Sequence, residues 1–204
     1  MSSITLLQDE YGTSYTNSEE IHKLAAEFYQ DLFTSESPPR SLSLYNLNTK
    51  RLSTIQRNSL DMEFLSSEVK DSVFSIKGNK APGPDGMSGK FFQHYWDIVG
   101  SDLTAMVLNF LNNRALLHKF NFTLITLVPK IKNPITMTNF RPIALCKTVA
   151  KVIAKCLATR LKNVLPTIIS ESQNAFVANR VITDNVLLSY EIHHFIKHKK
   201  TGRE

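Results

Sequence analysis

Apolar residues recur every three or four positions over several stretches of this chain, a spacing that predicts helices with one buried face. The first such stretch covers residues 17–34, where Asn17 precedes the periodic positions and Glu20 stands third in the helix. A polar N-cap residue followed by Glu at the third position is the capping-box pattern. We therefore expect a capped helix here, and its apolar face consists of Ile21, Leu24, Ala25, Phe28 and Leu32.

The same spacing predicts further helices along the chain. Gly100 separates two of them and Ser101 caps the second, because glycine disfavours helix interiors. The helix from Lys147 carries its apolar residues on one side, at Val149, Val152, Ile153, Cys156, Leu157, Leu161 and Val164. The expected ranges are 52–60, Ser66 or Ser67 to 76, 88–97, 101–113, 147–164 and 183–198.

Two stretches have the composition of strands instead. Residues 122–128 form a run of β-branched and aromatic residues, and residues 140–145 form a second run after a polar turn. These runs predict an antiparallel pair, and Pro142 places the second strand at an edge because proline cannot donate a ladder hydrogen bond. With an irregular or hairpin-like lead-in over residues 4–16, which turns at Tyr11-Gly12-Thr13, the pattern predicts an α+β fold that is mostly helical.

Charge is unevenly distributed along the 204 residues, whose formal net charge is +6. No Asp or Glu occurs between Leu103 and Ser170, whereas ten Lys and Arg do. Such a stretch produces the positive field of a polyanion-binding face. A solvated basic surface, or one offset by the acidic N-terminal third, would explain it too. The ten cations are Arg114, Lys119, Lys130, Lys132, Arg141, Lys147, Lys151, Lys155, Arg160 and Lys162.

The composition excludes several classes of protein. No apolar run approaches the roughly 20 residues that span a bilayer, so we expect no membrane partner. The start at Met1 has neither a basic nor an apolar leader segment, which favours an intracellular protein, cytoplasmic or nuclear and not secreted. Cys146 and Cys156 are expected to be free thiols. His194 and His198 share a helix face, but we interpret them as part of a helix end, where cations suit the helix dipole, and not as a metal site.

Three segments could contact phosphate or bases. The expected hairpin brings Lys130 and Arg141 to one end of a ribbon, where two cations suit a triphosphate, although an exposed Lys and Arg on a hairpin are usually just solvated. The loop Lys80–Gly86 has glycines that allow close approach to a phosphate, although a helix stop followed by a tight turn explains them better from these residues alone. Segment 173–180 offers amides, a guanidinium and Phe176, which either stacks on a base or anchors the loop.

Taken together, five segments closely resemble, in order and spacing, motifs of the reverse transcriptase of LINE-type (non-LTR) retrotransposons, particularly the plant kind. The resemblance covers about residues 60–204, and the helix at 17–34 fits the family's lead-in. Any one tetrapeptide would be unremarkable, but five in order are highly specific. The segments are Asn79-Lys-Ala-Pro-Gly-Pro-Asp-Gly-Met87, Leu127-Val-Pro-Lys130, Asn139-Phe-Arg-Pro-Ile-Ala-Leu145, Ser172-Gln-Asn-Ala-Phe-Val-Ala-Asn-Arg180 and Ile182-Thr-Asp-Asn185.

The resemblance implies the fingers subdomain of a right-hand polymerase, with helices, a small antiparallel hairpin and most of the palm missing. Residues 1–60 would be a helical lead-in and linker, and residues 61–204 a partial reverse transcriptase domain. The resemblance assigns Lys130 and Arg141 to the nucleotide triphosphate. The template-binding residues that it implies are Lys80, Gly83, Asp85, Gly86, Gln173, Asn174 and Arg180. The implied partners are RNA or an RNA–DNA hybrid without sequence specificity, and dNTP only weakly.

The carboxylates of polymerase chemistry have no counterpart in this sequence. Two divalent ions held by carboxylates drive that reaction, yet no Tyr-x-Asp-Asp occurs, and the resemblance places the first aspartate just beyond residue 204. We therefore expect no catalytic and no metal-binding residue here, and Mg²⁺ only in the full-length enzyme. The expected function is that of a fragment of an RNA-directed DNA polymerase, a nucleotidyltransferase, which binds template and nucleotide but is inactive alone. The alternative is a repurposed non-enzymatic module that binds nucleic acid or protein.

Overall fold

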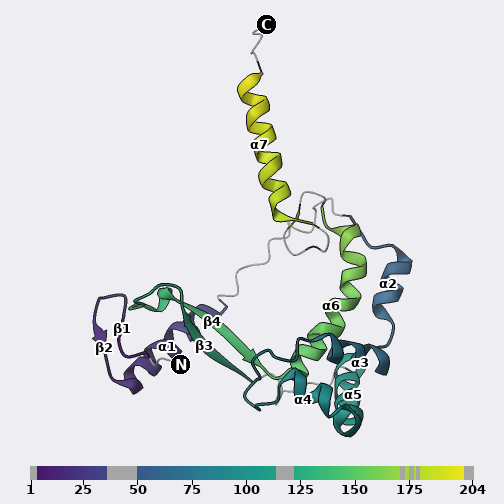
Figure 1. The fold of residues 1–204 in the computed structure, drawn as a ribbon, viewed down its shortest axis with the longest axis horizontal. Coiled ribbons are helices and arrows are strands. Elements are labelled where there is room, and N and C mark those ends of the chain that lie inside the picture. Colours follow the sequence, from purple (N-terminus) through teal and green to yellow (C-terminus); the bar gives the residue numbers. More distant parts are fainter. Residues whose placement is uncertain are drawn as a thin grey trace. The chain divides into compact units, whose positions relative to one another are not determined.

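The computed structural model describes residues 4–35, 50–113, 122–170, 173–174, 177 and 180–199. The chain divides into two compact units, and each combines segments that are distant in the sequence (Figure 1). The first unit consists of Met1–Asn46, Lys77–Val99 and Leu116–Lys151, and the second of Leu47–Ile76, Gly100–Ala115 and Val152–Glu204. The expectation of a mostly helical α+β fold is confirmed. The predicted boundary after residue 60 stays a prediction.

The first unit begins with the hairpin and helix that the sequence predicts. Strands β1 (Leu7–Gln8) and β2 (Ser14–Tyr15) pair antiparallel, and Gly12 in the turn between them has a φ of 83°, a conformation that glycine adopts readily. Helix α1 (Ser18–Phe33) follows. The Asn17 side chain caps it and accepts a hydrogen bond from the Glu19 N–H at 2.9 Å, one residue earlier than the capping-box pattern implies.

The predicted antiparallel ribbon is present and packs on α1. Strand β3 (Thr123–Pro129) pairs with β4 (Phe140–Cys146) in a two-stranded sheet, so both are edge strands and Pro142 is tolerated. A single turn of 3-10 helix, η3 (Met137–Asn139), precedes β4. One face of the ribbon contributes Phe140 and Leu127 to the core of this unit. The buried members of that core are Leu7, Ile21, Tyr29, Met137 and Phe140.

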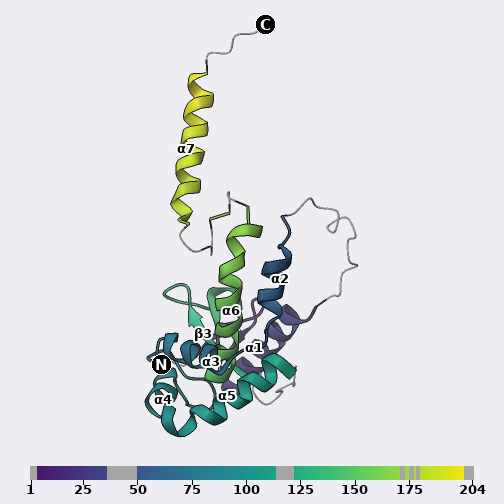
Figure 2. The ribbon, with the colours of Figure 1, turned by 90° about the vertical axis from the view of Figure 1, so that its right-hand side faces the viewer.

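The remaining helices differ in length from the prediction at several points. They are α2 (Thr54–Asp61), α3 (Ser66–Ser75), α4 (Gly89–His94), α5 (Trp96–Asn113), α6 (Thr148–Ile168) and α7 (Ile182–His198). In the second unit, Gln56 Nε2 donates to Thr167 Oγ1 at 3.1 Å, which links α2 to the end of α6 where the two helices run side by side (Figure 2). Val69, Val73, Val107 and Val152 are among the most deeply buried side chains of the described residues.

Three details of the helix prediction are wrong. Gly100 lies inside α5, and the break falls at Tyr95 instead, because a glycine costs a helix only about 1 kcal/mol and does not end it. Helix α3 begins at Ser66 as predicted, but no serine side chain caps it, because its N-cap residue is Leu65. Leu157 and Leu161 on α6 are 42% and 44% exposed, so the buried stripe of that helix is narrower than its apolar stripe.

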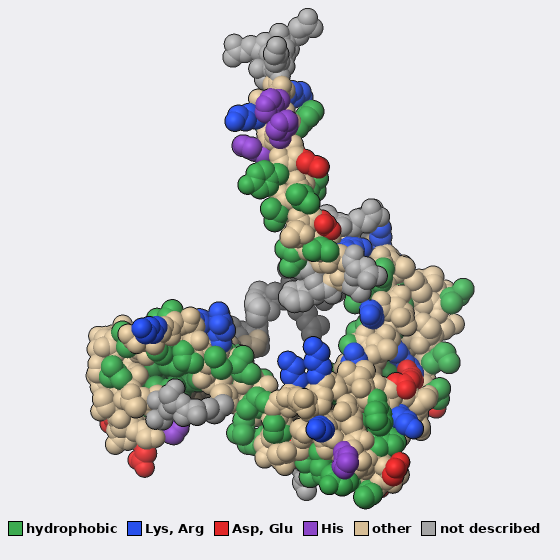
Figure 3. Space-filling view, viewed as in Figure 1, with side chains coloured by type: hydrophobic (Ala, Val, Ile, Leu, Met, Phe, Trp, Pro, Cys, Tyr) green, Lys and Arg blue, Asp and Glu red, His purple; other side chains and the backbone are tan. Residues whose placement is uncertain are grey.

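Helix α7 has no buried residue, although apolar side chains occur along its whole length (Figure 3). Among them, Tyr190 is 73% exposed and Ile196 is 65% exposed. A helix that is apolar on most sides is typical of one that another surface covers. No helix in the described part of the chain is long and apolar enough to cross a membrane.

Candidate nucleic-acid interface

The two cations predicted to bind triphosphate lie on the same face of the ribbon. Arg141 is opposite Val128 in the register, and the Lys130 N–H donates to the Asn139 carbonyl at 2.8 Å. Side chains two residues apart share a face, so Lys130 and Arg141 are diagonal neighbours, about 7–8 Å apart at Cα. Both are exposed. The ribbon therefore presents two cations together at its turn end, and their role remains a prediction.

The ammonium of Lys130 is partly engaged within the protein. Its Nζ donates to the Thr138 carbonyl at 2.7 Å. Because an ammonium has three N–H donors, it retains two for a ligand. Along the same face of the ribbon, Leu124, Val128 and Ile143 are between 41% and 46% exposed. The face that carries the cations is thus half apolar.

At the other end of the ribbon, the loop Lys80–Gly86 docks on the start of α6. A Cβ added to Gly83 would lie 2.6 Å from both N and Cα of Lys147, so glycine is required by this backbone contact. Thr148 is 1% exposed, and its Oγ1 donates to the Met87 carbonyl at 2.7 Å. Lys151 Nζ donates to the Ala81 carbonyl at 2.8 Å. Side chains from the first turn of α6 therefore hold the loop at both of its ends.

Within the loop, the other predicted residues have clear local roles. The Asp85 carboxylate accepts a hydrogen bond from the Met87 N–H at 3.1 Å, and the Gly86 N–H donates to the Gly83 carbonyl at 3.0 Å. Gly86 has a φ of 71°, which favours glycine. Lys80 is exposed. The two glycines and Asp85 thus shape the loop, and Lys80 is its exposed cation.

The predicted triphosphate pair and this loop occupy opposite ends of one rigid ribbon. Arg141 and Cys146 are five positions apart on β4, which corresponds to about 17 Å at about 3.4 Å per residue. The structure does not bring the two predicted sites into one pocket. It places them along one continuous element of the first unit.

In the second unit, the predicted template residues are engaged in hydrogen bonds within the chain. Arg180 donates through Nη1 to the carbonyls of Ser170 and Gln173, the latter at 2.8 Å. Asn174 is 9% exposed, and its Nδ2 donates to Asn185 Oδ1 on α7 at 2.8 Å. Phe176 lies outside the described residues. These contacts give Arg180 and Asn174 a role in tying the segment before α7 together, and their template contacts stay predictions.

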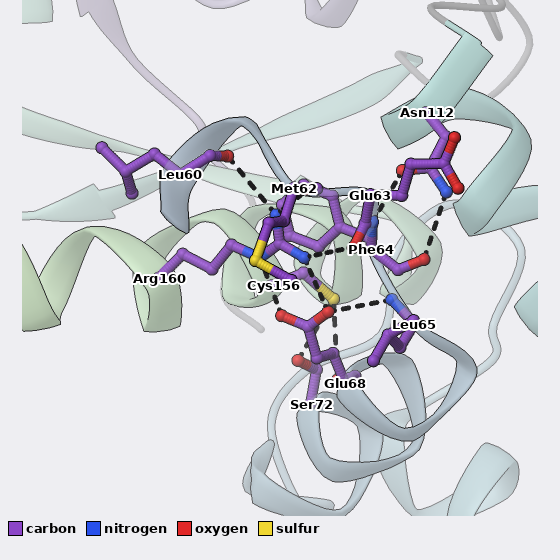
Figure 4. Close-up of polar contacts among 10 residues, drawn as sticks. All are labelled: Leu60, Met62, Glu63, Phe64, Leu65, Glu68, Ser72, Asn112, Cys156 and Arg160. Carbon is purple, nitrogen blue, oxygen red and sulfur yellow. Dashed lines mark hydrogen bonds and ion pairs between the residues drawn. The ribbon is translucent and has the colours of Figure 1, made fainter. Parts of the chain in front are cut away.

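Arg160 is the one predicted surface cation that the structure assigns most plainly to the interior (Figure 4). Its Nε and Nη2 form two hydrogen bonds of 2.8 Å with the Glu68 carboxylate, and only 13% of its side chain is exposed. The guanidinium also donates to the carbonyls of Leu60, Met62 and Glu63 and lies 3.5 Å from the centroid of the Phe64 ring. Arg160 is therefore a structural residue, and counting it toward a polyanion-binding face is wrong.

The ion pair and the burial around it shift the pKa values of two neighbouring groups. The hydrogen bonds from Arg160 hold the pKa of Glu68 below its ordinary value, against the opposing effect of burial. Burial raises the pKa of the Cys156 thiol, which donates to Ser72 Oγ at 3.2 Å. Both cysteines are free, as predicted. A sequence signal for Arg160 existed, because it follows Val152 and Cys156 at steps of four on the buried side of α6.

Metal-ligand chemistry finds no support in the part of the chain that the structure describes. No group of three or more His, Cys, Asp or Glu side chains there is arranged to hold a metal ion. The predicted requirement of the full-length enzyme for Mg²⁺ remains a prediction, because it concerns residues other than these.

Comparison with known proteins gives one informative similarity. No family model matches this chain. The chain is 31% identical over 201 residues to the transposon TX1 uncharacterized 149 kDa protein of Xenopus laevis, and the alignment covers 98% of this chain. It spans 15% of the length of that protein. This similarity relates the chain to a transposon-encoded protein and supports an origin in a transposon.

Proposed function

We propose that this chain is part of a LINE-type reverse transcriptase and that it grips the RNA template, or an RNA–DNA hybrid, through the loop Lys80–Gly86 and the start of α6. The observation that carries the proposal is the docking of the loop on α6. Because of it, the exposed Lys80 comes to the positive end of a 21-residue helix that carries Lys151 in its first turn and follows directly after Lys147. Helix N-termini and lysines together attract phosphate.

The proposal extends to the turn end of the ribbon, where Lys130 and Arg141 would contact the triphosphate of an incoming nucleotide. Arginine can bind phosphate oxygens in a bidentate manner while lysine supplies a point charge. The Arg141 side chain is exposed and, among the described residues, forms no hydrogen bond or ion pair, so its guanidinium is available. Contacts of this kind read charge and not sequence, which supports binding without sequence specificity.

We further propose that this chain does not extend a primer alone. Polymerase chemistry in this family requires an Asp-Asp pair, and no two consecutive aspartates occur in the sequence. A primer-extension assay with Mg²⁺ or Mn²⁺ is expected to give no product above background. Clear extension would refute this part of the proposal and leave the binding part untouched.

RNA binding is tested by the salt dependence of fluorescence anisotropy with a labelled single-stranded RNA. Each phosphate contact contributes about 0.7 to the slope of log K against log salt for single strands. The double variant Lys80→Gln/Lys147→Gln is expected to lower that slope by about 1.4 if each lysine makes one such contact. The matched control Lys23→Gln/Lys70→Gln removes the same charge from α1 and α3. Equal slopes for the two double variants would contradict the proposed site.

A further inference from the structure

A groove of about 790 Å³ lies in the first unit, outside both proposed phosphate sites. Its walls are the β1–β2 hairpin, one side of α1 and the turn Thr136–Thr138 that leads into β4. The floor is apolar, since Leu24 and Phe28 pack against the core of this unit. At the rim, Leu32 and Tyr11 are 59% and 85% exposed. The groove is a preformed concave surface within the size range of ligand sites.

The rim of this groove is strongly acidic. Four carboxylates line it, and among the residues that the structure describes no Lys or Arg does. Asp9 serves the hairpin itself, because its Oδ1 accepts the N–H groups of Tyr11 and Thr13 at 2.9 and 2.8 Å. Glu10, Glu27 and Asp31 remain. Lys23 approaches Glu27 only to 3.9 Å in an exposed pair, which offsets little of that charge.

The neighbouring groups respond to this charge. The pKa of Tyr15 is raised by its hydrogen bond to Asp9, by burial, and by the negative charges of Asp9, Glu20 and Glu27. Lys130, whose Nζ is bonded to the Thr138 carbonyl, is the cation that reaches the turn beside the groove. The groove therefore faces solvent with a net negative field.

The chemistry of the groove selects among possible occupants. Its carboxylates do not converge on a point, since the described residues contain no group arranged to hold a metal ion. Nucleic acid is disfavoured by like charge. Lys and Arg fit best, because their aliphatic stems cover apolar surface while their charged ends reach carboxylates, and Tyr11 offers a ring face to a cation.

From this complementarity we propose that the groove binds an extended basic peptide segment of a partner protein, in which Lys or Arg alternates with aliphatic residues. The part of α1 that lines the groove, from Leu24 to Leu32, is about 12 Å long at about 1.5 Å per residue. About four residues of an extended strand cover that length. The alternation follows from the geometry, because successive side chains of a strand point to opposite sides, one toward the acidic rim and one toward the apolar floor.

The proposal is tested on the full chain by anisotropy with a fluorescein-labelled Lys-Leu-Lys-Leu-Lys-Leu peptide. The double variant Glu27→Gln/Asp31→Asn removes two rim charges from exposed positions of α1 and is expected to weaken binding about tenfold. The control Glu63→Gln/Asp71→Asn removes the same charge from the second unit and is expected to leave binding unchanged.

Two results would overturn the proposal. One is equal weakening by both double variants, which would show attraction by overall charge. The other is equal affinity for a Glu-Leu-Glu-Leu-Glu-Leu peptide, which would show apolar adhesion alone. The labelled RNA serves as a third ligand, and the Glu27→Gln/Asp31→Asn variant is expected to bind it at least as well as the parent chain. The peptide result and the RNA result can therefore fail independently.

Discussion

Replacing Arg160 with methionine keeps an unbranched apolar side chain but removes the guanidinium, which lies over the Phe64 ring and joins α6 to the segment between α2 and α3. Glu68 then loses its ion pair and keeps only the Leu65 N–H, at 2.9 Å. The carbonyls of Leu60, Met62 and Glu63 lose a donor. Removing one partner of a buried pair costs about 3–5 kcal/mol, and since 32% of the Glu68 side chain is exposed to water we expect the lower end, about 3 kcal/mol.

Urea unfolding followed by circular dichroism measures this free energy. Lys162→Met on the exposed side of the same helix is the control and should change stability by less than about 0.5 kcal/mol. Glu68→Gln keeps the shape of the side chain and should cost about 1.5 kcal/mol, through the loss of a charged hydrogen-bond partner. The double variant should then be less destabilised than the sum of the single variants. Additive effects, or an Arg160→Met variant as stable as the Lys162→Met control, would refute the structural role of Arg160.

The lowered pKa of Glu68 fixes the direction in which its contribution to the free energy of unfolding changes with pH. The pKa of Glu68 is lower in the folded state than its ordinary value of 4.5, so its contribution is fully present above that pH. It is lost as the pH falls through the lower folded value. The Glu68→Gln variant should therefore show a smaller loss of stability on acidification than the parent chain. A parallel loss in both would contradict the assignment.

Other positions give equally direct tests. Gly83→Ala should weaken RNA binding and destabilise the first unit by about 1–3 kcal/mol, because its Cβ would meet the Lys147 backbone, whereas Gly12→Ala has open space and carries only the cost of its positive φ. A thiol reagent at neutral pH should modify Cys146 well before Cys156, which is 1% exposed and has a raised pKa, and equal rates would contradict that burial. Asn17→Ala should cost about 1 kcal/mol in thermal or urea unfolding through the lost cap of α1, and no change would mean that the cap is replaced by water.

Local sequence patterns were sufficient wherever neighbouring residues alone decide the structure. The cap at Asn17 and the turn at Gly12 both involve residues close in the chain, and so does the antiparallel pairing of the two ribbon strands across one polar turn. The periodic spacing of apolar residues predicted that the helices exist, but it did not predict the residues at which they begin and end. The break at Tyr95 shows why, since a glycine such as Gly100 lowers helix propensity by an amount that packing readily overrides.

The candidate site required more than the pattern of residues. The sequence grouped Lys130 with Arg141, because a hairpin turn brings neighbours together, and it marked the glycines of the loop at 80–86. That Gly83 packs on the Lys147 backbone, more than 60 residues later, depends on how α6 meets the end of the ribbon. Charge alone also could not separate a surface cation such as Lys80 from one that pairs inside the protein.

The sequence by itself thus determined the order of helices and strands, the acid-free window and the resemblance of its motifs. Only the tertiary structure decided which cations are free to meet a phosphate. In the sequence, Arg160 and Lys80 are both simply cations. The fold removes Arg160 from water, and a buried guanidinium is stable when it pairs with a carboxylate such as that of Glu68. Lys80 stays exposed to solvent, so its charge remains available at the surface. Burial is a property of long-range packing, and no local pattern of charge can specify it.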